Sequence, residues 1–166
     1  MTYLDLSRDI KARPKIGVPV ISVLLVDDHA SLRKGLRYLL EATNDIKVVA
    51  EASNGNDALF HVGLSRPDVA IIDISMPLMD GLETTRQIHI QCPFTRVIIL
   101  SIYDNPEYVR RSLEIGALGY VLKDTIVGDL IEAVRTVHQG KRYFSLRIAE
   151  IGNQYSSWKG NDSWAV

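Results

Sequence analysis

Residues 68–81 read Asp-Val-Ala-Ile-Ile-Asp73-Ile-Ser-Met-Pro-Leu-Met-Asp80-Gly81, an apolar run that ends on a carboxylate. The run is too short for a helix and predicts a buried strand over residues 68–74. Two other apolar runs also end on charged residues, at Val-Leu-Leu-Val-Asp27-Asp28 and at Gly-Tyr-Val-Leu-Lys123. Because ligands bind at the carboxyl ends of strands in open parallel sheets, we expect these charged side chains to converge on one site.

The rest of the sequence alternates between two periodicities. Short β-branched runs predict further strands over residues 21–26, 47–51, 95–101 and 118–122. Between the strands, apolar residues recur at helical spacing. These helical markers are Leu32, Leu36, Leu39 and Leu40; Ala58, Leu59 and Val62; Leu82, Thr85 and Ile88; Val109 and Leu113; and Leu130, Ile131, Val134 and Val137. Five β-α units predict an α/β fold, a doubly wound five-stranded parallel sheet with helices on both faces.

Composition narrows the class of protein. A chain of 166 residues with 46% apolar content and a net charge of −1 fits one compact domain, and this charge balance does not indicate nucleic acid or an anionic membrane. The single Cys92 excludes a disulfide framework. No run reaches transmembrane length, and the N-terminus lacks the apolar core of a signal peptide. We therefore expect a soluble, cytoplasmic protein without membrane contact.

The two ends differ from the middle. Residues 1–20 show no sustained period and are expected to form a flexible N-terminal arm before a domain over residues 21–140. Residues 141–166 are expected to be a C-terminal tail, either flexible or a short linker remnant. Ile148, Ile151, Tyr155 and Trp158 would share one helical stripe, but Gly, Ser and Asn between them are poor helix formers. The balance favours a mostly disordered tail.

The charged residues at the strand ends suggest phosphoryl chemistry. Asp27 and Asp28 next to Asp73 offer the oxygen ligands that a divalent cation such as Mg²⁺ prefers. Lys123 adds a mobile positive charge that suits a phosphoryl group. Each residue taken singly has a simpler explanation, since an isolated Asp28 before a helical stripe is more often an N-cap and a lone lysine is usually solvated. Together, the residues predict a phosphoryl-handling site.

Histidines do not add to this site at the level of sequence. His29, His61, His89 and His138 are scattered and lack the spacing of metal ligands. We therefore expect all four to be surface or boundary residues.

Taken in order, these motifs carry a family resemblance. Asp27-Asp28, the segment 71–81, the strand end Leu100-Ser101 and the segment Gly119-Tyr120-Val-Leu-Lys123 resemble the receiver domain of bacterial two-component response regulators. Val-Asp-Asp-His29 with Arg33-Lys34-Gly35-Leu36 is most similar to the NarL/FixJ (LuxR-type) subfamily. The likeness spans roughly residues 21–140 and implies the flavodoxin-like strand order that receivers share.

The resemblance implies a role for each acidic residue. Asp73 would be the nucleophile that accepts a phosphoryl group from the phosphohistidine of a sensor histidine kinase. Asp27, Asp28 and Asp73 would hold Mg²⁺, and the backbone carbonyl of Ser75 would supply a further oxygen. Such a domain would be a signalling acceptor that catalyses only its own phosphorylation and dephosphorylation.

The resemblance also implies a switch. Lys123 would pair with one phosphoryl oxygen, and Ser101 would hydrogen-bond another. Tyr120 would turn from an outward to an inward rotamer as Ser101 moves, and would reshape the face made by the fourth helix, fifth strand and fifth helix. Homodimerisation on phosphorylation is the expected readout.

Two alternatives to a complete signalling receiver remain open: part of a DNA-binding regulator, and an enzyme of another class. NarL/FixJ regulators usually continue into a helix-turn-helix domain, and the sequence shows no recognition helix or basic stripe, so we expect no direct DNA binding. The chain would then be a natural single-domain receiver, the receiver part of a truncated transcriptional regulator, or an excised fragment. In another class, haloacid-dehalogenase-like phosphohydrolases also use Mg²⁺ and an Asp after a strand. Those enzymes need a second Asp two residues later, where this chain has Ser75.

Overall fold

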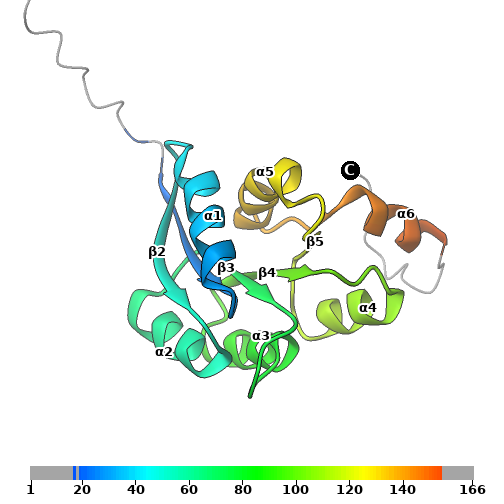
Figure 1. The fold of residues 1–166 in the computed structure, drawn as a ribbon, viewed down its shortest axis with the longest axis horizontal. Coiled ribbons are helices and arrows are strands. Elements are labelled where there is room, and N and C mark those ends of the chain that lie inside the picture. The colour runs from blue at the N-terminus through cyan, green and yellow to red at the C-terminus, as the bar shows by residue number, and fades with distance from the viewer. Residues whose placement is uncertain (1–16, 18, 155–166) are drawn as a thin grey trace, which may run out of the picture.

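The computed structural model describes residue 17 and residues 19–154. Strands and helices alternate along this part of the chain, six of each (Figure 1). The strands are β1 (Ile21–Val26), β2 (Ile46–Ala52), β3 (Val69–Asp73), β4 (Arg96–Ser101), β5 (Gly119–Leu122) and β6 (Tyr143–Phe144). The helices are α1 (Ala30–Glu41), α2 (Gly55–Ser65), α3 (Gly81–Gln91), α4 (Pro106–Glu114), α5 (Ile126–His138) and α6 (Leu146–Gln154). None of these helices has the length and apolar content needed to cross a bilayer.

All strand pairs are parallel, in the order β2-β1-β3-β4-β5-β6. The predicted doubly wound α/β fold is therefore confirmed. Val26 pairs with Ile72 and Asp73 pairs with Leu100, so the carboxyl ends of the central strands lie at one edge of the sheet. This register is what brings the charged ends of three strands together.

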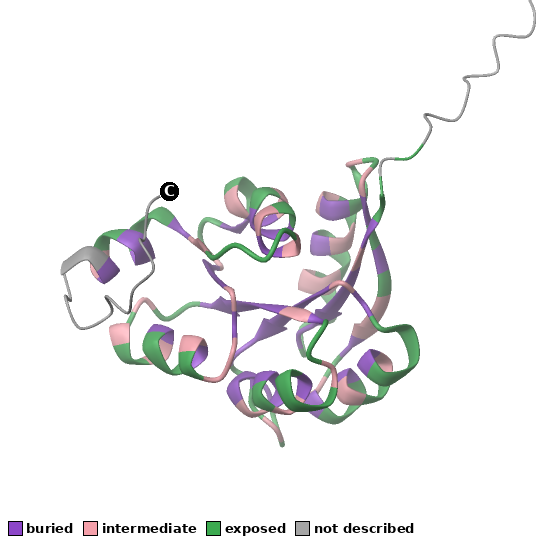
Figure 2. Ribbon diagram, turned by 180° about the vertical axis from the view of Figure 1, so that it is seen from behind, coloured by how far each residue is buried: buried purple, intermediate pink, exposed green. Residues whose placement is uncertain are grey.

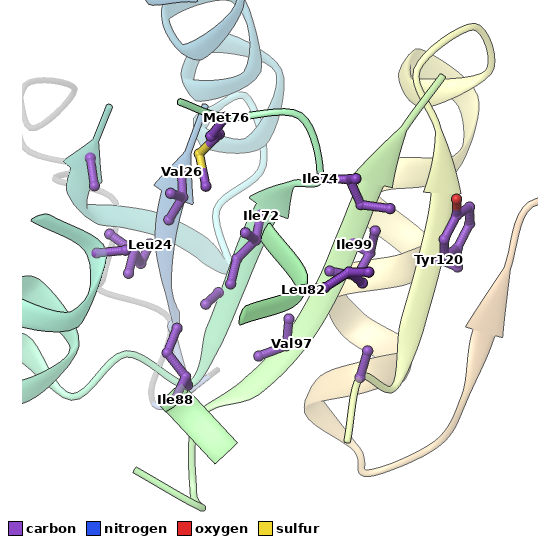
Figure 3. Packing of buried hydrophobic residues seen from close by; sticks show 14 of the residues in the cluster. Leu24, Val26, Ile72, Ile74, Met76, Leu82, Ile88, Val97, Ile99 and Tyr120 are labelled. Carbon is purple, nitrogen blue, oxygen red and sulfur yellow. The ribbon is translucent and has the colours of Figure 1, made fainter. Parts of the chain in front are cut away.

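Helices cover both faces of the sheet. Buried side chains of α2, α3 and α4 pack on one face with Leu24, Ile72 and Ile99 (Figure 3). Those of α1 and α5 pack on the other face. Strands buried on both faces appear as continuous purple ribbons in Figure 2. This two-sided burial explains why β3 and β5 are apolar runs, whereas β2, at the edge of the sheet, alternates buried residues with the exposed Lys47 and Val49.

The sheet has a sixth strand where the sequence predicted five. The β6 strand pairs with β5 through the Tyr143 N–H, which donates to the Leu118 carbonyl at 3.0 Å, and the Ser145 N–H, which donates to the Tyr120 carbonyl at 3.1 Å. A strand of two residues is too short to show a period of two, so its pairing has no signature in the sequence.

Part of the expected tail is ordered as α6. Ile148 is fully buried in the cluster that also holds Val109 and Tyr120, and Ile151 packs against that cluster. This tertiary burial outweighs the weak helix propensity of the segment. The remaining stripe residues, Tyr155 and Trp158, lie with the rest of 155–166 outside the described residues, as do residues 1–16 and 18 of the expected N-terminal arm.

A buried serine fixes the start of α6. The Ser145 hydroxyl donates to Asp129 Oδ2 at 2.6 Å and accepts from the Leu122 N–H at 3.0 Å. Asp129 also accepts from Thr125 Oγ1 at 2.7 Å and from the Tyr143 hydroxyl at 3.2 Å. Because Leu122 immediately precedes Lys123, this network joins α6 and α5 to the strand that carries the site lysine.

Replacing Ser145 with Ala should lower the free energy of unfolding by about 1–3 kcal/mol, because it leaves the buried Leu122 N–H without its acceptor and removes one of the donors to Asp129 Oδ2. Chemical denaturation measures the change. Ser65→Ala is the matched control: Ser65 is exposed and its hydroxyl donates to the His61 carbonyl within its own helix. Equal losses in the two variants would contradict the structural role given to Ser145.

Candidate functional site

Three strand ends bring their charges together, as the sequence predicted. Asp73 ends β3, Asp27 follows β1, and Lys123 follows β5. Lys123 Nζ lies 2.9 Å from Asp27 Oδ2 and 3.2 Å from Asp73 Oδ2. Asp27 and Asp73 are 1% and 2% exposed, so this ammonium group is the counter-charge that both buried carboxylates need.

Burial and charge act against each other on the site pKa values. Burial raises the pKa of Asp73, and the nearby Lys123 and the Ser75 N–H offset only part of that rise. Burial acts to lower the pKa of Lys123, but its contacts with Asp27 and Asp73 outweigh this, and the net pKa is raised. Lys123 therefore stays positively charged at neutral pH.

The two carboxylate oxygens of Asp73 differ in their hydrogen bonding. Its Oδ1 accepts from the Ser75 N–H at 3.2 Å. Its buried Oδ2 makes no well-aligned hydrogen bond, and its contact with Lys123 is an ion pair at 3.2 Å. Behind it, α3 begins so close to β3 that a Cβ on Gly81 would lie 2.1 Å from the Asp73 carbonyl oxygen. Only glycine fits at this position without displacing the backbone that carries Asp73.

The side chain of His29 lies beside the acid pair that follows β1. Helix α1 begins after His29, not after Asp28, so Asp28 is not its N-cap. His29 Nδ1 lies 3.0 Å from Asp27 Oδ1 and 3.0 Å from Asp28 Oδ1. His29 is a surface residue, as expected, with its side chain 65% exposed, but it also contacts the acidic site, which its spacing from the other histidines did not indicate. The only signal in the sequence is that His29 directly follows the acid pair.

Ser101 and Tyr120 meet at the loop after β4. The Ser101 hydroxyl accepts from the Tyr103 N–H at 2.9 Å, and the Tyr120 hydroxyl donates to the Tyr103 carbonyl at 2.8 Å. The Lys123 N–H donates to the Ser101 carbonyl at 2.9 Å, which ties this loop to the site lysine. Burial raises the pKa of Tyr120 to about 12, against an opposing effect of the Ser101 hydroxyl.

Tyr120 is already buried in this structure. Its side chain is fully shielded from solvent in the cluster on the α4 face, and Figure 3 shows it beside the β4 strand that carries Ile99. The family resemblance implies that this inward position follows phosphorylation. The structure shows the inward position with an unmodified Asp73, held by the bond to Tyr103.

Helix α6 reaches the same two loops. Arg147 forms ion pairs with Asp104, three residues after Ser101, and with Asp124, which follows Lys123. The sequence did not indicate these pairs, because they join residues that lie in three separate segments. They place the C-terminal helix beside the loops that extend from β4 and β5.

The ligand atoms for a cation lie close together. One side-chain atom from each of Asp27, Asp28, His29 and Asp73 lies within 4.8 Å of the others. Carboxylate oxygens are the preferred protein ligands of Mg²⁺, so the donor set fits this ion. Ser75, whose carbonyl the family resemblance adds to the set, is exposed next to Asp73.

The fold and this site define a class of protein. The profile described as "Response regulator receiver domain" matches residues 23–135, and the chain belongs to this family of signalling domains. The family match speaks against the haloacid-dehalogenase-like alternative.

Relatives come from the transcriptional branch of the family. The chain is 38% identical over 124 residues to the uncharacterized transcriptional regulatory protein YxjL of Bacillus subtilis, which covers 75% of this chain and 57% of that protein. It is 40% identical over 129 residues to the oxygen regulatory protein NreC of Staphylococcus epidermidis, covering 77% of this chain and 59% of that protein. The chain thus spans between half and two thirds of the length of these relatives.

Solved structures show the same fold. A LuxR-family response regulator from Aurantimonas has a TM-score of 0.78 at 31% identity, covering 81% of this chain and 97% of the other. The receiver domain of the putative response regulator NarL from Mycobacterium tuberculosis has a TM-score of 0.71 at 33% identity, covering 74% and 99%. Both agree with the predicted likeness to the NarL/FixJ (LuxR-type) subfamily.

Replacing Asp73 with Asn should raise the melting temperature of the metal-free protein at neutral pH. The native pKa of Asp73 lies above its ordinary value of 3.8, so the native state holds this proton to higher pH than the unfolded chain. The wild type therefore loses stability as pH rises through the window between those two values, and Asn, which has no charge to bury, does not. Melts between about pH 3 and pH 8 test this: the gain should fade in acid, and an Asn variant less stable at every pH would contradict it.

Proposed function

We propose that this receiver domain accepts a phosphoryl group on Asp73 from the phosphohistidine of a sensor histidine kinase. One observation carries the proposal: the buried Oδ2 of Asp73 lacks a well-aligned hydrogen bond and faces a charged lysine at 3.2 Å. An oxygen in this position is a nucleophile with a counter-charge ready for the incoming group.

Each residue around Asp73 has a role in the transfer of the phosphoryl group. A carboxylate oxygen of Asp73 attacks phosphorus, the phosphorus–nitrogen bond of the donor phosphohistidine breaks, and an aspartyl phosphate forms. Lys123 pairs with a phosphoryl oxygen, and the Ser101 hydroxyl donates to another after giving up its bond from Tyr103. Asp27, Asp28, Asp73 and the Ser75 carbonyl would hold Mg²⁺, which would supply positive charge to offset that of the transferred group.

The effect of phosphorylation on the protein surface would pass through the loop after β4. Movement of Ser101 disturbs the Tyr103 contacts of Tyr120 and so alters the surface formed by α4, β5 and α5. We propose that this surface then changes its self-association, in the cytoplasm, where the kinase would deliver the phosphoryl group. A similar protein, RcsB, has been solved as dimers bound to DNA, with a TM-score of 0.73 at 26% identity. Direct DNA contact is assigned to no described residue of this chain.

The central test is incubation with Mg²⁺ and acetyl phosphate followed by intact mass spectrometry. The wild type should gain one phosphoryl group only when Mg²⁺ is present, and Asp73→Asn should gain none, because the amide is not a nucleophile for this reaction. Asp80→Asn is the matched control: Asp80 is exposed and caps α3 through the Glu83 N–H, a role that Asn also fills. Full labelling of Asp73→Asn would assign the nucleophile to another residue.

A second test concerns the cation. Mg²⁺ should raise the melting temperature, because it binds the folded acid cluster and not the unfolded chain. At a hundredfold excess over its Kd, this adds about 2.7 kcal/mol to the free energy of unfolding. Replacing both Asp27 and Asp28 with Ala should abolish this response. A similar Mg²⁺ shift in the double variant would place the cation outside the cluster.

A further inference from the structure

His29 adds a nitrogen atom to a cluster of oxygen ligands. Its Nδ1 lies 3.0 Å from one oxygen of Asp27 and 3.0 Å from one oxygen of Asp28. Adjacent ligands of a first-row metal ion, at bond lengths of roughly 2.0–2.2 Å, lie about 3–3.5 Å apart. The imidazole nitrogen is therefore already at the spacing of a ligand beside this acid pair.

Backbone structure holds His29 in this place. As the N-cap of α1 it has an extended conformation, with φ −87° and ψ 101°, and its N–H donates to Asp27 Oδ1 at 2.8 Å. The ring thus extends from the turn that also fixes the acid pair. Asp73, 2% exposed and with its Oδ2 lacking a well-aligned hydrogen bond, completes the group of ligand atoms within 4.8 Å.

We propose that His29 is a metal-specificity residue: its Nδ1 ligates the bound cation and gives the site a preference for imidazole-binding transition metals over Mg²⁺. This inference deepens the proposed function, since it uses the same metal site. Mg²⁺ is a hard cation that takes oxygen ligands, whereas imidazole suits Zn²⁺, Ni²⁺ and Cu²⁺. A site of carboxylates and one carbonyl alone lacks this selective element.

The exposure of the ring is compatible with this role. His29 is 65% exposed, so ligation does not require the imidazole to be desolvated first. Its bonds to Asp27 and Asp28 are replaced by bonds from all three residues to one cation, so no side chain loses a partner. Lys123 remains bound to the second oxygen of Asp27, at 2.9 Å, and keeps that carboxylate in place.

The test is calorimetric titration of Ni²⁺ and of Mg²⁺ into the untagged full chain and into His29→Gln. The ratio of Ni²⁺ to Mg²⁺ affinity should fall about tenfold or more in His29→Gln, since even outer-sphere partners of a metal ligand alter affinity by about 10–100-fold. His61→Gln, on α2, is the matched control for binding to other histidines and should keep the wild-type ratio. An unchanged ratio in His29→Gln would overturn the inference.

A spectroscopic measurement separates ligation from a general effect on stability. Pulsed electron paramagnetic resonance of the Mn²⁺-loaded protein should show coupling to a directly bound nitrogen in the wild type and none in His29→Gln. Absence of that coupling in the wild type would also overturn the inference. Failure of this inference is distinguishable from failure of the proposed function, because acetyl phosphate labelling of Asp73 with Mg²⁺ does not depend on the nitrogen ligand.

Discussion

The ammonium group of Lys123, shared by two buried carboxylates, is the interaction on which the site depends. Asp27 and Asp73 are almost completely shielded from water, and two such charges without a counter-charge would be strongly destabilising. The three residues come from the ends of β1, β3 and β5, so this charge balance spans most of the width of the sheet. The chemical site and the alignment of the strands are therefore one arrangement.

Most of the fold was predictable because its signals are local. Strands buried on both faces, such as β3 and β5, are short apolar runs that end at a charged residue, and the predicted β1 bounds agree with those found. The β6 strand gave no such signal, and the helical stripe of α6 was opposed by the poor helix formers between its apolar residues. Two residues cannot show a period, and the order of α6 comes from burial of Ile148 against residues distant in sequence.

In the site, too, some features follow from local sequence signals and others depend on tertiary contacts. Carboxylates and a lysine at the ends of predicted parallel strands must converge if the sheet is parallel, and Asp27, Asp73 and Lys123 do. Side-chain orientation is not determined by strand position. The contact of His29 with the acid pair depends on the turn before α1, and the inward position of Tyr120 depends on a bond to the loop after β4. Both are tertiary details that no periodicity encodes.

The β6 strand also covers the edge of the sheet that β5 would otherwise form. Unpaired edge strands offer a row of backbone donors and acceptors to other chains and are common starting points for aggregation. Here the carbonyls of Leu118 and Tyr120 are bonded to the β6 segment, and the Leu122 N–H is bonded to Ser145. The opposite margin is β2, which carries the exposed Lys47. A two-residue strand thus removes from β5 the template on which a foreign strand would add, and leaves β2 as the longer open margin of the sheet.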